Sequence, residues 1–83
     1  MNELQEKKVL TLDSREVADM VEKRHADLMR DIRKYEEFLT NAKMRSLDFF
    51  IPSTYADSKK EERPNYLVTK KGCEFIAHKL TGQ

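Results

Sequence analysis

The chain has 83 residues, with 16 lysines and arginines against 15 aspartates and glutamates, so its formal net charge is +1. This length allows one domain with a small core. No apolar run is long enough to span a membrane or to form a signal peptide, so no membrane partner is expected. The single cysteine, Cys73, excludes a disulfide within the chain and suits a reducing cytoplasm.

Charge is distributed unevenly along the chain. Residues 23–34 carry five cations and two anions, and residues 58–71 again carry five and two. Residues 1–22 and 35–57 are acidic, with net charges of −3 and −2. Local fields, more than net charge, guide a polyanion to a protein. The two basic blocks therefore predict where a polyanion would bind.

The N-terminal region predicts one short strand. Residues 7–13 carry an apolar alternation, which is typical of a half-buried strand. Its apolar positions are Val9, Leu10 and Leu12. Residues 1–6 are expected to form a flexible N-terminus.

Residues 14–34 have the pattern of two amphipathic helices joined by a tight basic turn. Ser14 is placed to cap the first helix by accepting a hydrogen bond from a free backbone N–H. One face of this helix carries its apolar residues, which are Val17, Ala18 and Val21. The turn carries the residues that we expect to anchor the next helix to phosphate, namely Lys23, Arg24 and His25.

The second helix is longer, and the helix-turn-helix is expected to span residues 14–39. Its apolar stripe consists of Leu28, Ile32, Tyr35 and Leu39, with Phe38 beside it. The opposite face carries Ala26, Arg30, Arg33, Lys34 and Glu37. In a major groove, Arg can grip a guanine edge with two hydrogen bonds, Lys can neutralise phosphate and Ala allows close approach. A charged face that only meets water is the alternative interpretation.

A hairpin is predicted over residues 48–69. Residues 48–55 favour a strand in which Pro52 requires an edge or a bulge, and residues 66–69 form the returning strand. The polar loop 57–65 between them is expected to be mobile. It carries the cations that would touch phosphate or the minor groove, namely Lys59, Lys60 and Arg63. Glu61 and Glu62 offset two of these charges, which leaves a solvated loop as the alternative.

The last helix is predicted over residues 70–81, with Thr69 as its cap. Its apolar stripe is Cys73, Ile76, Ala77 and Leu80, with Phe75 beside it. Gly72 is expected to weaken the first turn. Together the elements predict an α+β fold, a small winged helix-turn-helix domain over residues 7–83 with the order β-α-α-β-β-α.

Residues that would indicate an enzyme are not grouped. The histidines are His25 and His78, and Cys73 lies five residues before His78, so the two side chains would point in different directions on a helix. One cysteine is too few for a zinc site of common spacing, and the two glycines form no phosphate loop. We expect no catalytic activity, no metal and no cofactor.

Two motifs resemble the N-terminal domain of the phage regulatory Rha family. The first is a Ser that opens a Val-Ala helix, a Lys-x-His turn and an Arg-Asp-Ile helix, here Ser14, Val17-Ala18, Lys23-Arg24-His25 and Arg30-Asp31-Ile32. The second motif runs through Phe49-Phe50-Ile51, Ser53-Thr54-Tyr55, Asp57, Pro64, Tyr66-Leu67 and Thr69-Lys70-Lys71-Gly72. The resemblance implies a DNA-binding regulator from a phage or prophage, acting in the cytoplasm of a bacterial host.

The chain departs from the family pattern at two positions. Glu22 stands where the family often has Gly. If the turn needs a positive φ, a residue other than glycine there would cost up to about 1 kcal/mol of stability. Asp27 stands where an amide is common, and it would either repel phosphate or accept a hydrogen bond from a cytosine amine. Relatives also continue beyond position 81 into a further C-terminal region.

The sequence therefore predicts a transcriptional regulator that binds double-stranded DNA with its second helix in the major groove. The alternative is a phage antirepressor or adaptor that binds a phage or host regulatory protein. In that case Tyr35, Phe38 or the Phe49-Phe50 pair would be exposed anchors. A homodimer on a palindromic site is a further expectation under the first interpretation.

Overall fold

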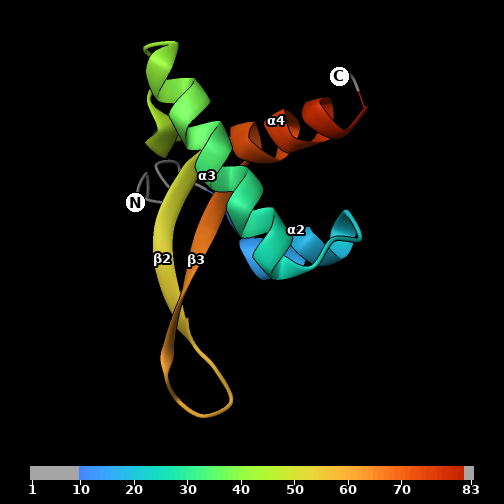
Figure 1. The fold of residues 1–83 in the computed structure, drawn as a ribbon, viewed down its shortest axis with the longest axis vertical. Helices are drawn as coiled ribbons and strands as arrows, with labels where there is room; N and C mark the ends of the chain where they lie inside the picture. Colours follow the sequence, from blue (N-terminus) through green and yellow to red (C-terminus); the bar gives the residue numbers. More distant parts are fainter. Residues whose placement is uncertain (1–9, 82–83) are drawn as a thin grey trace, which may run out of the picture.

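The computed structural model describes residues 10–81 of the chain. In chain order these form β1 (Thr11–Asp13), α2 (Ser14–Met20), α3 (His25–Asn41), the short 3-10 helix η1 (Ser46–Asp48), β2 (Phe50–Ala56), β3 (Glu62–Thr69) and α4 (Lys70–Thr81). The fold is α+β in the predicted order β-α-α-β-β-α (Figure 1). The expected flexible segment 1–6 and the first part of the predicted strand, 7–9, lie outside the described residues.

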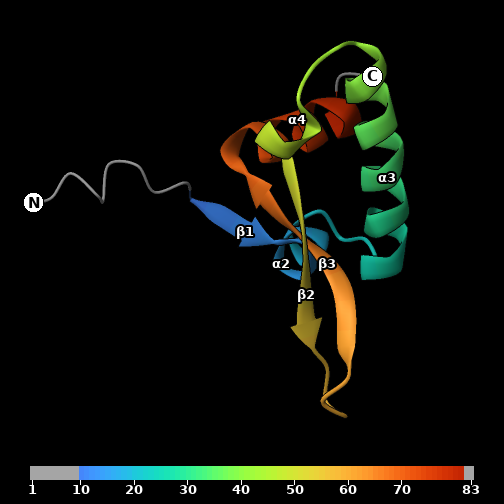
Figure 2. The same ribbon diagram turned by 90° about the vertical axis from the view of Figure 1, so that its left-hand side faces the viewer.

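The three strands form one antiparallel sheet in the order β1-β3-β2. β2 pairs with β3 along its whole length, from Phe50 opposite Val68 to Ala56 opposite Glu62. β1 pairs only with Leu67, Val68 and Thr69 of β3. The hairpin of β2 and β3 therefore extends past the rest of the sheet as a two-stranded arm (Figure 2), and we call this arm, residues 54–64, the wing.

Both prolines lie where a strand has a free edge. Pro52 lies in β2, an edge strand as predicted. Pro64 lies in the part of β3 that pairs with β2 alone. A missing N–H on the unpaired side costs no ladder bond, so both positions tolerate proline.

The core lies between the helices and one face of the sheet. Leu28 and Ile32 of α3 and Phe50 and Val68 of the sheet are almost completely buried. The other buried apolar residues are Val17, Ala18, Met29, Leu39, Tyr66 and Ile76. The predicted apolar stripe of the second helix is thus confirmed at Leu28, Ile32 and Leu39, whereas Tyr35 is half-buried and Phe38 is exposed.

Asp13, and not Ser14, caps α2. The Asp13 carboxylate accepts a hydrogen bond from Arg15 N at 2.8 Å, and Glu16 reaches back to Asp13 N at 3.2 Å, which completes a capping box. Ser14 is the first residue of the helix and is fully buried. The predicted cap was therefore wrong by one residue, because an acidic residue with a glutamate three positions later satisfies the free N–H groups better.

The wing turn is shorter than predicted. The returning strand β3 begins at Glu62 and not at residue 66, so the connection is residues 57–61. Asp57 closes it, since its carboxylate accepts hydrogen bonds from the backbone N–H groups of Lys59 and Glu61, both at 2.9 Å. Local side-chain bonds of this kind hold a turn in one shape, so the structure contains a compact turn where a longer, mobile loop was expected.

The first strand of the hairpin also begins later than predicted. Asp48 belongs to η1, and β2 starts at Phe50. Thr69 explains the difference, because its hydroxyl donates to the Asp48 carbonyl at 2.6 Å. This bond holds the η1 backbone against the junction of β3 and α4.

The last helix has the predicted bounds but a different buried face. The Thr69 hydroxyl accepts from Gly72 N at 3.1 Å, as expected for a cap. Ile76 is buried, but Ala77 and Leu80, which were predicted to be buried with it, are exposed. Gly72 is needed for packing, because a Cβ there would lie 2.2 Å from the Phe49 carbonyl oxygen. α4 thus packs closely at its start and projects outward at its end (Figure 1).

Within residues 10–81, the structure contains no helix with the length and apolar character needed to cross a membrane.

Candidate nucleic-acid interface

Ser14 fixes where α3 starts. Its hydroxyl accepts a hydrogen bond from Tyr66 N at 3.0 Å, lies 2.8 Å from His25 Nε2 and donates to Met29 Sδ at 3.8 Å. If His25 carries its proton on Nε2, Ser14 uses both lone pairs and its one proton. A single buried hydroxyl therefore joins α2, the first turn of α3 and β3.

The turn between α2 and α3 requires an unusual backbone conformation. Glu22 has φ = 59°, in the left-handed region that favours glycine. The Lys23 side chain then forms an ion pair with Asp31 of α3, and both side chains are partly buried. Lys23 was predicted to anchor the turn to phosphate, but its ammonium group holds the turn against α3.

His25 is the first residue of α3, and its side chain packs against the rest of the protein. It is half-buried, and its ring meets the edge of the Tyr55 ring with centroids 6.1 Å apart. Burial lowers the pKa of His25, and nearby Arg15 acts in the same direction while Asp13 opposes it. This shift favours the neutral imidazole, and the bond to Ser14 positions the start of α3, whereas the sequence suggested a bond from His25 to phosphate.

Three charged residues form a cluster at the N-terminal end of α3. Asp27 accepts hydrogen bonds from Arg24 Nε at 3.0 Å and Arg24 Nη2 at 3.3 Å, and a third from Arg30 Nη2 at 3.0 Å. Both arginines are largely exposed. The pKa of Asp27 is lowered, first by the hydrogen bond from Arg24 and then by Arg30. We call these three residues the Asp27 cluster.

The predicted reading face of α3 is exposed along its length. Ala26, Arg30, Arg33 and Lys34 are all exposed. Arg33 Nη1 donates to the Met29 carbonyl at 3.2 Å, which leaves its other N–H groups available. Among residues 10–81, Lys34 has no ion-pair partner.

The predicted wing cations differ in how firmly they are held. Arg63 lies in β3 and pairs with Asp57 at 2.9 Å and with Glu61 at 3.4 Å. Lys59 and Lys60 are exposed at the turn, where Lys60 has φ = 65°. Arg63 therefore has a fixed position on the wing, while the two lysines lie at its tip.

A residue that the sequence analysis did not select lies next to this surface. The Arg15 guanidinium lies 3.8 Å from the centre of the Tyr55 ring and forms two hydrogen bonds with Asp13, at 3.1 and 2.7 Å. Asp13 is the α2 cap, and the Arg15 hydrogen bond holds the pKa of its carboxyl well below the usual range. The strand period places Tyr55 on the same face of β2 as Ile51 and Ser53, but it does not indicate the contact with Arg15.

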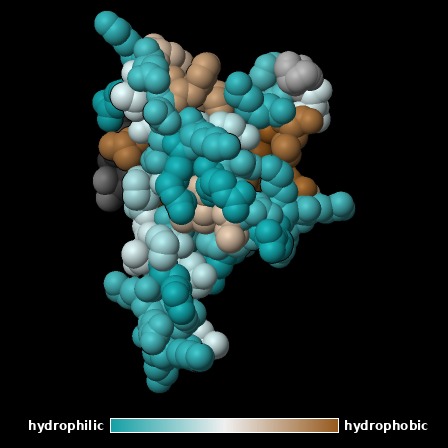
Figure 3. Space-filling view, viewed as in Figure 1, coloured by the Kyte–Doolittle hydropathy of each residue, from teal (hydrophilic) through white to brown (hydrophobic). Residues whose placement is uncertain are grey.

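α3 and the wing border one hollow. This hollow has a volume of about 250 Å³, and its lining comes from α3 and the wing: His25, Ala26, Met29, Arg33, Tyr55, Arg63 and Pro64. Figure 3 shows a mainly hydrophilic surface that runs from the α3 region in the centre down to the wing. The fold thus brings α3 of the first basic block and the wing to the same side of the molecule, while Lys70 and Lys71 of the second block line a different hollow.

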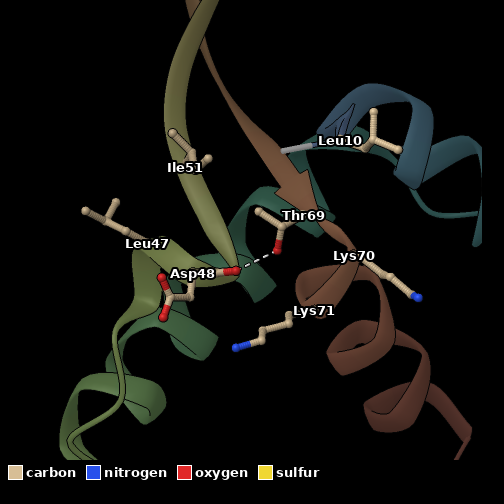
Figure 4. A pocket seen from close by; sticks show the side chains of 7 residues that line it. All are labelled: Leu10, Leu47, Asp48, Ile51, Thr69, Lys70 and Lys71. Atoms are coloured by element: carbon tan, nitrogen blue, oxygen red, sulfur yellow. Dashed lines mark hydrogen bonds between the residues drawn. The ribbon is translucent and has the colours of Figure 1, made fainter. Parts of the chain in front are cut away.

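A larger hollow lies elsewhere and has a different character. Its volume is about 530 Å³ and its lining is mainly apolar: Leu10, Leu47, Asp48, Ile51, Thr69, Lys70 and Lys71 (Figure 4). The two lysines carry its cationic charge. Within the described part of the chain, no group of three or more His, Cys, Asp or Glu side chains could hold a metal ion.

These features define a class, a small α+β domain with a winged helix-turn-helix arrangement whose second helix exposes a basic face. The chain belongs to the phage regulatory protein Rha family, whose pattern it matches over residues 12–83. It is also 51% identical over 73 residues to the SPbeta prophage-derived protein YoqD of Bacillus subtilis (strain 168), which is named as a candidate antirepressor. That match covers 88% of this chain and 29% of the relative. No solved structure matches the chain.

Proposed function

We propose that this phage-type regulator binds double-stranded DNA, with α3 in the major groove and the wing on the backbone or the adjacent minor groove. Arg30, Arg33 and Lys34 are the principal contacts of the helix, and Ala26 allows close approach. Arg24 contacts phosphate at the start of α3. Lys59, Lys60 and Arg63 position the wing on phosphates.

One observation carries this proposal: the exposed basic face of α3 and the cationic wing border the same hollow. A duplex that follows this surface would meet cations from both parts at once, although the net charge of the chain is only +1. Phosphate contacts from two elements fix the register of a helix in the groove. Membership of a phage regulatory family agrees with this function.

The experiment is selection of binding sites from a random duplex library with the full 83-residue chain. We expect an enriched motif that covers the base pairs contacted by one helix in the major groove and the adjoining base pairs under the wing. A palindromic motif would also support a homodimer, because a dimer of helix-turn-helix domains reads two half-sites. Recovery of no motif, together with no retention of any duplex at low salt, would contradict the proposal.

A second candidate is an antirepressor or adaptor that binds another regulatory protein. Two observations favour it: Phe38 is exposed, as such an anchor should be, and the relative YoqD is named for that role. Phe50 is fully buried and Tyr35 and Phe49 are half-buried, so of the four predicted anchors Phe38 is the most exposed. Under this function Phe38→Ala would abolish partner binding, and Arg30→Ala would leave it unchanged. Under the first function Arg30→Ala would weaken DNA binding, and Phe38→Ala would leave it unchanged.

A further inference from the structure

Asp27 has an unexpected place for an acidic residue, on the side of α3 that is proposed to approach a polyanion. Its carboxylate faces two arginines, and its side chain is less exposed than either of theirs, at 30% against 81% for Arg24 and 61% for Arg30. A carboxylate here costs affinity for every DNA sequence, because it repels phosphate. Its place in the first turn of α3 suits the helix dipole, and its bonds to two exposed arginines give it a second role at this surface.

The two arginines are held in different ways. Arg24 uses both Nε and Nη2 on Asp27, which engages one edge of its guanidinium. Arg30 uses a single bond from Nη2. A guanidinium has five N–H donors, so Arg30 keeps four of them, and the free hydrogen of Nη2 forms a two-donor fork with either Nε or Nη1 that fits the O6 and N7 atoms of guanine.

Held side chains discriminate better than free ones. A long exposed arginine loses rotamer freedom when it binds, and a free one can turn to any nearby phosphate. The bond to Asp27 reduces both the loss of rotamer freedom and the bonding to nearby phosphates, because it restricts Arg30 before DNA binds. Arg24 has two of its five donors engaged by Asp27 and precedes the first turn of α3, where the phosphate contact is proposed.

We propose that Asp27 is a specificity-determining residue, which orients Arg30 for a guanine and lowers the affinity for DNA of unrelated sequence. It acts through Arg30, so it is a positioning residue and not itself a base contact. This inference rests on the proposed DNA-binding function and replaces the two roles that the sequence suggested, contact with cytosine and simple repulsion.

The test compares three variants of the full chain on the selected motif, on that motif with each base pair replaced in turn, and on random duplex. Asp27→Asn removes the charge and one arginine acceptor. Asp27→Glu keeps the charge but displaces it by one methylene group. Asp48→Asn is the matched control, because Asp48 also pairs with an arginine three residues away, Arg45, and η1 lies at the end of the fold away from the wing.

We expect Asp27→Asn to bind random duplex roughly two- to fivefold more tightly, while its discrimination at one base pair falls by roughly tenfold. Asp27→Glu should lose discrimination without gaining affinity for random duplex. Asp48→Asn should change neither quantity. Circular dichroism of each variant checks that the protein is still folded. If Asp27→Asn is unfolded, the discrimination of Asp27→Glu is compared with that of the parent protein to test whether Asp27 orients Arg30.

Two results would overturn this role of Asp27 alone. If Asp27→Asn gains affinity for every sequence equally, the carboxylate acts only as a charge. If Asp27→Glu keeps full discrimination, the position of the carboxylate does not matter. A parent protein that binds no duplex would instead contradict the proposed function, and the inference with it.

Discussion

Glu22 adopts a backbone conformation that is strained for a residue with a side chain. Its φ of 59° is accessible to glycine at almost no cost, whereas a side chain with a Cβ is strained there. The sequence predicted this strain on the condition that the turn needs a positive φ, because Glu22 stands where the family often has glycine. The positive φ is confirmed, and the energetic consequence is a prediction.

We predict that Glu22→Gly raises the free energy of unfolding by up to about 1 kcal/mol. Urea denaturation followed by circular dichroism measures this change. Glu37→Gly is the control, because Glu37 is exposed in the middle of α3 and should lose about 1 kcal/mol. A decrease in stability at position 22 would show that the turn does not favour glycine.

Arg30 carries the sharpest prediction about recognition. Arg30→Ala should lower the affinity for the selected motif by roughly 1–3 kcal/mol if Arg30 reads a guanine, and the preference at one base pair should weaken. Arg45→Ala is the control, since Arg45 is an exposed arginine paired with an aspartate beyond the C-terminal end of α3. Titration of labelled duplex measures both. An unchanged footprint and affinity would remove Arg30 from the reading face.

At the scale of elements, Ser14 joins three of them. We predict that Ser14→Ala lowers the free energy of unfolding by about 1–3 kcal/mol, because Tyr66 N would remain buried without an acceptor. Exposed Ser58 in the wing turn provides the control, and Ser58→Ala should change stability by less than about 0.5 kcal/mol. Equal effects in urea denaturation would contradict this role of Ser14.

The elements also show which parts of the fold are readable from sequence. The 3.6-residue periodicity predicted the buried residues Leu28 and Ile32 and the exposed arginines of α3, because period and face are local properties. The role of Ser14 was missed, because its bond to Tyr66 joins positions 52 residues apart. The exposure of Leu80 was missed too, since an amphipathic pattern does not say how far a helix packs along its neighbour.

The candidate site divides in the same way. Charge counting found the two basic blocks, and the fold placed Arg33 of the first and Arg63 of the second beside one hollow. Charge counting could not predict that Lys23 pairs with Asp31 or that Asp27 pairs with two arginines, because side-chain pairing depends on rotamers as well as on spacing. Arg15 was passed over for a related reason: its neighbour Tyr55 is 40 positions away.

Across the whole molecule, Tyr66 connects β3 to the middle of α3. Its hydroxyl donates to Glu36 Oε1 at 2.7 Å. Burial, and then this bond to a carboxylate, raises the pKa of Tyr66 to about 12 from its ordinary 10.0. The fold thus favours the protonated phenol. The stabilisation that comes from the protonated Tyr66 phenol is complete below pH 10, and it is lost as the pH rises from about 10 towards 12.

We therefore predict that the parent protein loses stability between pH 9 and pH 11 faster than Tyr66→Phe does. Urea midpoints at pH 9, 10 and 11 measure the two slopes. Lysine deprotonation affects both proteins alike, so the difference between slopes isolates Tyr66. Parallel slopes would show that the ionisation of Tyr66 is not coupled to folding.

The most direct test of DNA binding by this surface is the salt dependence of the affinity for random duplex DNA. About four phosphate contacts from α3 and the wing give a slope of log K against log salt of about −3.6, roughly a hundredfold loss between about 50 and 200 mM salt. The variant with Lys59, Lys60 and Arg63 changed to alanine should show a slope shallower by about 2 to 3. Absence of binding at low salt, or binding that does not respond to salt, would contradict the account.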